Sequence, residues 1–140
     1  MKSFIISAFG AVGTAIAHAF GGWDASIIVL LSFMAIDYLT GVIVASVFHK
    51  SKKSESGGLE SRAGWKGICK KCTVILLVIA ANLLDMQLGA SFVRDGVCIA
   101  FLTNELLSIV ENAALMGLPI PKALQKALDI LADKKEDETK

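Results

Sequence analysis

The chain has 140 residues, of which 54% are hydrophobic and 19% are charged. With a mean hydropathy of +0.63, this composition excludes an ordinary soluble domain, although the length alone would suit one. The formal net charge of +1 gives no indication of nucleic-acid binding, and we expect no nucleic-acid partner.

Four apolar stretches follow one another along the chain, each close to the roughly 20 residues that cross a bilayer. They cover about residues 4–23, 25–47, 72–90 and 96–118. No soluble fold of this length uses four such segments. The sequence therefore predicts an all-α integral membrane protein with a single membrane domain over residues 1–132.

The first stretch gives the weakest signal, because Gly, Ala and Ser dominate it and His18 lies near its end. A signal peptide is a competing interpretation, with Lys2 as the basic n-region and Ala17 and Ala19 near a cleavage site. A third interpretation is an uncleaved helix that lies in the membrane or moves in and out of it. We therefore expect four spans, or three.

The basic residues orient these spans. Of the 14 Lys and Arg residues, only Arg94 lies in a connection on the far side; the others precede the first span, fill residues 48–71 or follow the fourth span. The positive-inside rule then places both termini and the 48–71 loop in the cytoplasm, so we expect a bacterial cytoplasmic-membrane protein. The Gly- and Ser-rich segment 51–64 is predicted to be a flexible part of this loop.

Beyond the fourth stretch, Pro119 and Pro121 are expected to stop the helix. From Pro121 a new pattern begins, with Ala and Leu on one face and Lys, Gln and Asp on the other. It predicts an amphipathic helix over residues 121–132, lying on the inner leaflet or packing on a neighbour. Residues 133–140 form a mixed-charge tail that we expect to be disordered.

Five polar side chains share one side of the fourth stretch. Because each helical residue advances by about 100°, they fall within an arc of roughly 120°. They are Asn104, Glu105, Ser108, Glu111 and Asn112. Lipid does not accept such a stripe, so it must face other helices or water. Two interpretations stay open: the stripe holds helices together by hydrogen bonds, or it lines an aqueous lesion when subunits assemble.

Other polar groups also lie inside the apolar stretches. Asp37 is near the middle of the second, and Asn82 and Asp85 lie toward the end of the third. A carboxylate near the bilayer midplane costs roughly 2.5–3.5 kcal/mol on insertion scales. We expect Asp85 to reach the membrane interface. The short side chain of Asp37 must instead be protonated, or bind a helix terminus or a lysine from the cytoplasmic side.

Enzymatic chemistry finds little support in the sequence. It contains no HExxH, GxSxG or P-loop motif, and His18 and His49 lie far from each other and from the acids. Cys69 and Cys72 form a single CxxC pair with no second pair beside it, which does not indicate a metal or redox centre. We expect no enzyme activity, no metal and no cofactor.

Four local patterns resemble the holin family of phage lysis and toxin secretion, the group that includes clostridial phage holins. They are Asp37-x-x-Thr40-Gly41 in the second span; Ser61, Gly64, Lys66-Gly67 and Lys70-Lys71 in the basic loop; Asn104-Glu105-x-x-Ser108-Ile109-x-Glu111-Asn112 in the fourth span; and Gly117-x-Pro119-x-Pro121 after it. Their order and spacing are similar to that family from about residue 30 to residue 125.

The resemblance implies a small membrane protein that accumulates harmlessly, forms homo-oligomers in lipid and then opens large holes. A cell-wall hydrolase, or in some relatives a large toxin, passes through them or gains access to its target. Two other functions stay open on the residues alone. One is a small ion or proton channel, or a transporter subunit, that uses the intramembrane carboxylates. The other is a membrane protein whose basic loop binds a cytoplasmic partner or anionic lipid.

Overall fold

The computed structural model describes residues 1–137, and it contains helices and loops but no strand over that range. The helices are α1 (Lys2–Ala19), α2 (Ala25–Ile43), its π-helical continuation η1 (Val44–Phe48), α3 (Ser61–Leu88), α4 (Phe92–Leu115) and α5 (Lys122–Asp137). Four segments, namely α1, α2 with η1, α3 and α4, are long and apolar enough to cross a membrane. The predicted all-α membrane fold with a C-terminal helix is confirmed.

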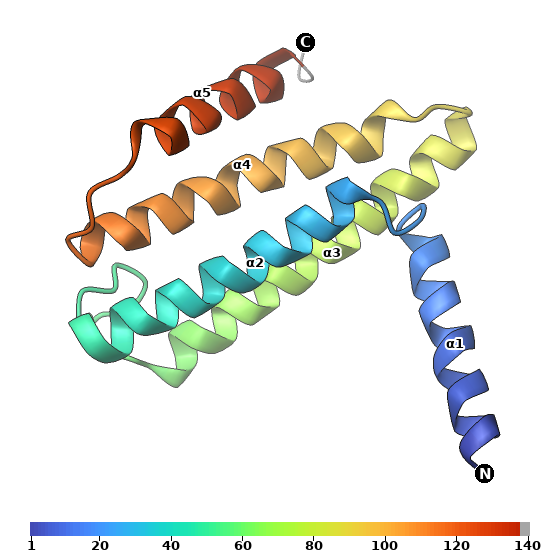
Figure 1. Ribbon diagram of the computed structural model, residues 1–140, viewed down its shortest axis with the longest axis horizontal. Helices are drawn as coiled ribbons and strands as arrows, with labels where there is room; N and C mark the ends of the chain where they lie inside the picture. The colour runs from blue at the N-terminus through green and yellow to red at the C-terminus, as the bar shows by residue number, and fades with distance from the viewer. Residues whose placement is uncertain (138–140) are drawn as a thin grey trace.

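Three of the spanning helices form a bundle (Figure 1). α4 packs along α2 and α3, and α5 turns back and runs along α4 on the side that faces away from them. A small apolar core fills the bundle near the end where α1 joins. Its buried members are Phe20, Ile27, Leu30, Met34, Val78 and Cys98.

α1 stands apart from the bundle and points away from it (Figure 1). None of its residues is buried, and its main contact with the bundle is with α3, at the junction. Phe4, Ile6 and Phe9 are each more than two-thirds exposed. Such a continuous apolar surface is unsuited to water, so α1 requires lipid or another protein around it.

Local signals fix the turns between the helices. The Asp24 carboxylate accepts a hydrogen bond from the Ile27 amide at 3.1 Å and so caps α2. Gly89, with a φ of +64°, ends α3 in the left-handed conformation that favours glycine. Gly117, with a φ of +83°, ends the turn after α4 in the same way. α4 therefore stops at Leu115, before the prolines that were expected to end it near residue 118.

The predicted 48–71 loop is wrong over its second half, because α3 begins at Ser61. The 28 residues of α3 make a helix of about 42 Å, which exceeds the roughly 30 Å hydrocarbon core. The first turns of α3 therefore project beyond the lipid, and the polar, Gly-containing sequence of this part concealed its helical state. The predicted span 72–90 is the more apolar remainder of the same helix.

The C-terminal prediction also needs a correction. α5 continues to Asp137, so residues 133–137 are helical and not part of a disordered tail. Lys134 and Lys135 lie in the last turn, where positive charge stabilises the helix dipole. Residues 138–140, the remainder of the predicted tail, lie outside the described residues. At the other end of the chain, α1 stops at Ala19 and not near residue 23, because Gly21 and Gly22 both adopt positive φ.

Candidate functional site

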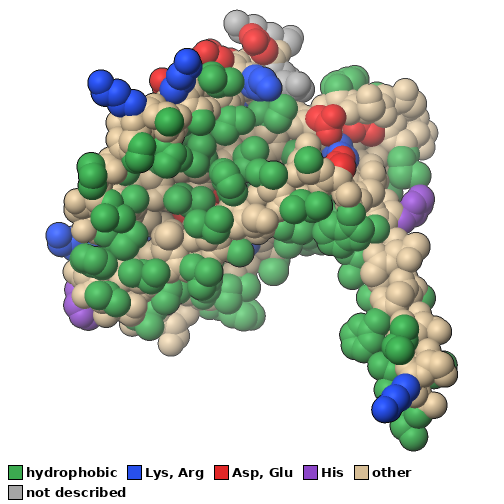
Figure 2. Space-filling model, in the orientation of Figure 1, with side chains coloured by type: hydrophobic (Ala, Val, Ile, Leu, Met, Phe, Trp, Pro, Cys, Tyr) green, Lys and Arg blue, Asp and Glu red, His purple; other side chains and the backbone are tan. Residues whose placement is uncertain are grey.

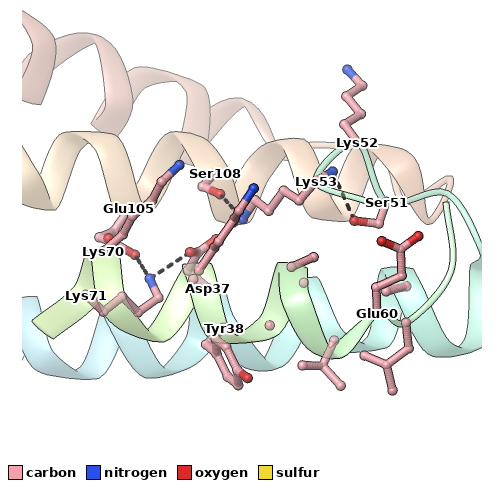
Figure 3. A pocket seen from close by; sticks show the side chains of 18 of the residues that line it. Asp37, Tyr38, Ser51, Lys52, Lys53, Glu60, Lys70, Lys71, Glu105 and Ser108 are labelled. Carbon is pink, nitrogen blue, oxygen red and sulfur yellow. Dashed lines mark hydrogen bonds and ion pairs between the residues drawn. The ribbon is translucent and has the colours of Figure 1, made fainter. Parts of the chain in front are cut away.

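An ion-pair cluster joins α2, α3 and α4 inside the bundle (Figure 3). The Lys71 Nζ lies 2.8 Å from the Asp37 Oδ2 and 2.6 Å from the Glu105 Oε2. Lys53, from the loop before α3, places its Nζ 3.9 Å from the Asp37 Oδ1. The side chains of Asp37, Glu105 and Lys71 are only 7%, 12% and 17% exposed. We call these four residues the Lys71 cluster.

Polar neighbours complete the hydrogen bonding of the cluster. The Asn112 amide donates to the Asp37 Oδ1 at 3.3 Å and to the Thr40 hydroxyl at 2.9 Å. The Lys53 ammonium lies 3.5 Å from the Ser108 hydroxyl. Two acids and two lysines give the cluster no net formal charge. The carboxylates that lipid would refuse are therefore neutralised within the chain, and a buried charge is tolerated only when it is paired in this way.

Small residues allow the helices to approach each other at this end of the bundle. A Cβ atom added to Gly64 would lie 3.4 Å from the Tyr38 hydroxyl, and one added to Gly67 would lie 3.6 Å from the Tyr38 ring. At Gly41, the nearest atom to such a Cβ would be the Asn112 amide nitrogen, at 3.8 Å. Most residues that carry the holin resemblance thus gather around the Lys71 cluster.

A cleft of about 580 Å³ opens beside the cluster, between α2, α3 and the loop that joins them. Asp37, Glu105 and Lys71 lie along it (Figure 3), together with Ser108. Four further lysines of the loop and of the first turns of α3 also line it: Lys52, Lys53, Lys66 and Lys70. The cleft is therefore basic on its outer side and charge-paired at the cluster.

A second polar cluster lies near the junction with α1. Arg94 is 7% exposed, and its guanidinium donates to the Phe20 carbonyl, to Asp24 at 2.8 Å and to Asp95 at 3.1 Å. The hydrogen bond from Arg94 lowers the pKa of the Asp24 carboxyl below its usual value. These contacts tie the start of α4 to the turn between α1 and α2.

Asp85 and Asn82 belong to the same region. Asp85, which the sequence leads us to expect at the membrane interface, is buried in the protein and accepts hydrogen bonds from the Val93 and Arg94 amides at 3.0 and 2.8 Å. It therefore caps α4 from the end of α3. Asn82 donates to the Ala19 carbonyl at 3.0 Å. We call Asp24, Asn82, Asp85 and Arg94 the Arg94 cluster.

The five polar residues of α4 do not form one surface. Glu105, Ser108 and Asn112 face α2 and α3 beside the Lys71 cluster. Asn104 is exposed and accepts a hydrogen bond from Lys135 of α5 at 3.1 Å. Glu111 is exposed and makes no hydrogen bond or ion pair within residues 1–137.

Lys53 and Arg94 were not predicted as site residues, and Lys71 was predicted only as part of a family pattern. A signal existed for two of them. Arg94 is the only basic residue in its connection and is adjacent to Asp95. Lys71 directly precedes the third apolar stretch, so it is placed to pair with an acid of a neighbouring span. Within residues 1–137, no group of His, Cys, Asp and Glu side chains is placed to hold a metal ion.

Residues 14–133 match the model of the bacteriophage holin family. The chain belongs to the bacteriophage holin family. The predicted resemblance is confirmed, and the chain is a multi-pass membrane protein with a holin-type role. The holin family is not an enzyme family.

Individual relatives of this holin come from several bacteria. An uncharacterised 14.9 kDa protein of Clostridium perfringens is 39% identical over 126 residues, which is 89% of each chain. An uncharacterised protein of Listeria innocua is 36% identical over 95% of this chain and 88% of its own. The uncharacterised protein YqxH of Bacillus subtilis is 37% identical over 76% of this chain and 71% of its own. No solved structure matches the chain.

Proposed function

We propose that copies of this chain assemble in the cytoplasmic membrane and open large, non-selective lesions. A cell-wall hydrolase, or in an alternative setting a secreted toxin, then crosses the membrane or gains access to its target. While α5 rests on the inner leaflet, both termini and the loop between α2 and α3 face the cytoplasm, in agreement with the positive-inside rule. Family membership supports the holin-type role, and the distribution of charge over the folded chain supports the lesion.

One side of the bundle suits lipid. Over residues 25–48 and 72–88 the only charged side chains are Asp37 and Asp85, and both are buried. The exposed side chains there include large hydrophobic residues on α2 and α3, among them Ile28, Ile36, Leu39, Leu76, Leu77 and Leu83. Figure 2 shows such apolar side chains over the bundle and over α1. This side can face acyl chains at no electrostatic cost.

The α5 side of the bundle does not suit lipid. The Lys135 ammonium reaches Asn104, and the Thr103 hydroxyl donates to the Leu131 carbonyl at 3.3 Å, so α5 lies level with the middle of α4. Charged side chains gather along this edge (Figure 2), and those exposed on α5 include Lys126, Asp129, Asp133 and Lys134. A single such charge at the bilayer centre costs roughly 2.5–3.5 kcal/mol on insertion scales.

This two-sided distribution is the observation that carries the proposal. The charged edge of α5 and the exposed Asn104 and Glu111 require water or another subunit, while the opposite side requires lipid. A ring of subunits satisfies both demands when the α5 side lines an aqueous interior and the α2 and α3 surfaces face outward. While the lesion is closed, the α5 side is covered by neighbouring subunits, or α5 leaves α4 for the inner leaflet.

The membrane potential supplies a timing signal. Moving one charge through the full field changes its energy by about 2.3 kcal/mol per 100 mV. The Lys71 cluster has no net formal charge and responds little. The charges of α5 also cancel over Lys122–Asp137, so Glu111 is the group among these that responds directly. Depolarisation removes this bias and allows the charged edges to turn toward water, which opens the lesion.

A small ion or proton channel is the alternative function. Its ion sites would be Asp37 and Glu105, yet both carboxylates are already paired with Lys71 inside the bundle. The paired arrangement favours a structural role for these acids over reversible ion binding.

Inducible expression in bacteria separates the two functions. We expect an abrupt release of a cytoplasmic protein marker, advanced by an uncoupler, and cell lysis when a wall hydrolase without its own export signal is co-expressed. A channel would collapse the membrane potential but retain the protein marker, and that result would contradict the proposal. A catalytically inactive hydrolase is the control for lysis that does not require wall cleavage.

A further inference from the structure

The basic cleft beside the Lys71 cluster has more positive than negative side chains and can therefore bind an anion. Five lysines and three acids line it, namely Asp37, Glu60 and Glu105, which leaves a formal excess of 5 − 3 = +2. Each of the three acids already has a partner. Asp37 and Glu105 pair with Lys71. Glu60 accepts hydrogen bonds from the Ser56 hydroxyl at 2.6 Å and the Ser56 amide at 3.0 Å, which lower the pKa of its carboxyl.

Three of the five lysines have no such partner. Lys52, Lys66 and Lys70 are exposed and make no hydrogen bond or ion pair within residues 1–137. Lys66 and Lys70 are four residues apart on α3 and therefore share one face of that helix. Lys52, from the loop, also lines the cleft, and its long side chain extends away from Lys70 and Lys71 in Figure 3. The residues that line the cleft thus include three lysines, from two elements, whose side chains have no partner within residues 1–137.

The donors of these lysines favour a compact anion. Gly64 and Gly67 also line the cleft and carry no side chain, so α3 lies close to the Tyr38 side chain of α2 there. Each lysine brings three hydrogen-bond donors and no acceptor. A phosphate group, with several acceptor oxygens and negative charge, matches this donor set.

Apolar side chains next to the cleft identify the source of the phosphate. Leu59 lines the cleft and is 61% exposed, and Trp65 and Ile68 on the first turns of α3 are 67% and 40% exposed. Tryptophan is enriched at the membrane–water interface, which is where these turns emerge from the lipid. A free phosphate ion would contact only the lysines, whereas a phospholipid would also cover the apolar rim with its acyl chains.

We propose that this cleft is a binding site for the phosphate group of an anionic phospholipid, contacted by Lys52, Lys66 and Lys70. Basic pockets between transmembrane helices on the cytoplasmic side bind such headgroups in other membrane proteins. The site uses the orientation given under the proposed function, but it does not depend on lesion formation. A bound headgroup also spans the loop and α3, next to the pair that links α3 to α4.

Fluorescence quenching tests the site on the full-length chain. The chain has two tryptophans, so Trp23→Phe leaves Trp65, which is adjacent in sequence to the cleft residue Lys66, as the only tryptophan reporter. The protein is placed in phosphatidylcholine vesicles that contain brominated phosphatidylglycerol or, in parallel, brominated phosphatidylcholine. We expect phosphatidylglycerol to quench Trp65 with several-fold higher relative affinity. Equal quenching by the two lipids would overturn the proposal.

Matched variants separate this site from general surface charge. Lys66→Gln combined with Lys70→Gln should abolish the several-fold preference for phosphatidylglycerol, because one lysine at an anionic surface is usually worth about five-fold. Lys66→Arg with Lys70→Arg should retain the preference and shows that the helix still folds. Lys122→Gln with Lys126→Gln makes the same charge change on α5. An equal loss in this control would mean that the bilayer surface, and not the cleft, selects the lipid.

A third arm distinguishes lipid from free phosphate. Inorganic phosphate is added to the same vesicles at constant ionic strength, with chloride as the control. Loss of the phosphatidylglycerol preference with phosphate, but not with chloride, supports phosphate recognition in the cleft. A preference that persists in both salts also supports the lipid site, because the lipid then binds more tightly than the free ion. Trp65 emission that responds to phosphate without any lipid preference would assign the cleft to the free ion and overturn the lipid proposal.

Discussion

Lys71 lies between Asp37 and Glu105, with its ammonium 2.8 Å from one carboxylate and 2.6 Å from the other. It is separated from each of them by 34 positions in the sequence. One lysine of α3 therefore ties together α2 and α4, the helices that carry these two acids. Its removal leaves Glu105 without a close cation and leaves Asp37 with Lys53 alone, at 3.9 Å.

Lys71→Met should destabilise the bundle by about 3 kcal/mol, because breaking a buried ion pair leaves uncompensated charge. The thermal unfolding of the purified protein in detergent, followed by circular dichroism, measures this loss. The triple variant with Asp37→Asn and Glu105→Gln should recover most of the stability. If the triple variant is no more stable than Lys71→Met, the ion pairs are not the reason for the loss.

Glu105→Gln should have a milder effect on stability, about 1 kcal/mol, because Lys71 still pairs with Asp37. It weakens the link between α3 and α4, so we expect normal accumulation in the membrane but earlier onset of lysis. Lysis time after induction, normalised to the amount of protein in the membrane, is the measurement. Unchanged timing would count against any role for the Glu105 charge.

Asn104→Leu and Glu111→Leu should make the exposed side of α4 acceptable to lipid and delay or abolish lesion formation. The variants remove polar groups that have no partner in α2 or α3, so the fold itself should remain intact. Thr73→Leu on the exposed side of α3 is the matched control, since the Thr73 hydroxyl bonds only to the Cys69 carbonyl of its own helix. Release of the cytoplasmic marker should be normal in the control. Similar delay in all three variants would remove the special role of α4.

Acid should weaken the contact between Asp24 and Arg94. The pKa of Asp24 is lowered in the folded protein, so its ion pair stabilises the fold above the unfolded-state pKa and is lost as pH falls through the folded-state pKa. We expect the Tm to decline below about pH 4, and Asp24→Asn to reduce that dependence. Since the Asp24 side chain is 49% exposed, the effect should stay below about 1 kcal/mol. An identical pH profile in Asp24→Asn would exclude this contact as the cause.

Cysteine labelling tests the orientation of the spans. In a background without Cys69, Cys72 and Cys98, single cysteines replace Ser3, Ser56 and Ser91. If all four helices cross the membrane, a membrane-impermeant reagent outside the cell should reach only position 91. Labelling of position 3 from outside would place the N-terminus there and leave three spans after it.

The sequence was sufficient for the fold class because each span is a continuous apolar run, and such runs report membrane insertion without any tertiary information. The sequence was less informative about where each helix begins and ends. Ser61–Lys71 is polar and contains Gly64 and Gly67, so it resembles a loop, yet it continues the helix that follows. The left-handed turn at Gly117, and not the prolines, decides where α4 gives way to the next segment.

The candidate site was only partly predictable. The helical arc of α4 indicated that its polar groups need partners. Glu105, Ser108 and Asn112 have partners in the bundle and Glu111 has none within residues 1–137, and periodicity cannot say which helix supplies a partner. Lys71 and Lys53 meet Asp37 only because α3 and the preceding loop fold back over α2. Likewise, Asn104 faces α5 while Asn112 faces α2, although the arc placed both on one side of α4.

α1 has a consequence of a different kind. Its last turn and the following Phe20 are held by Asn82 and Arg94, while no residue of α1 is buried in the bundle. The surrounding bilayer and adjacent molecules therefore set the tilt of this segment. α1 is therefore available to bind the apolar surface of a neighbouring copy. The contact that assembles the subunits can then differ from the α5 surface that lines the aqueous lesion.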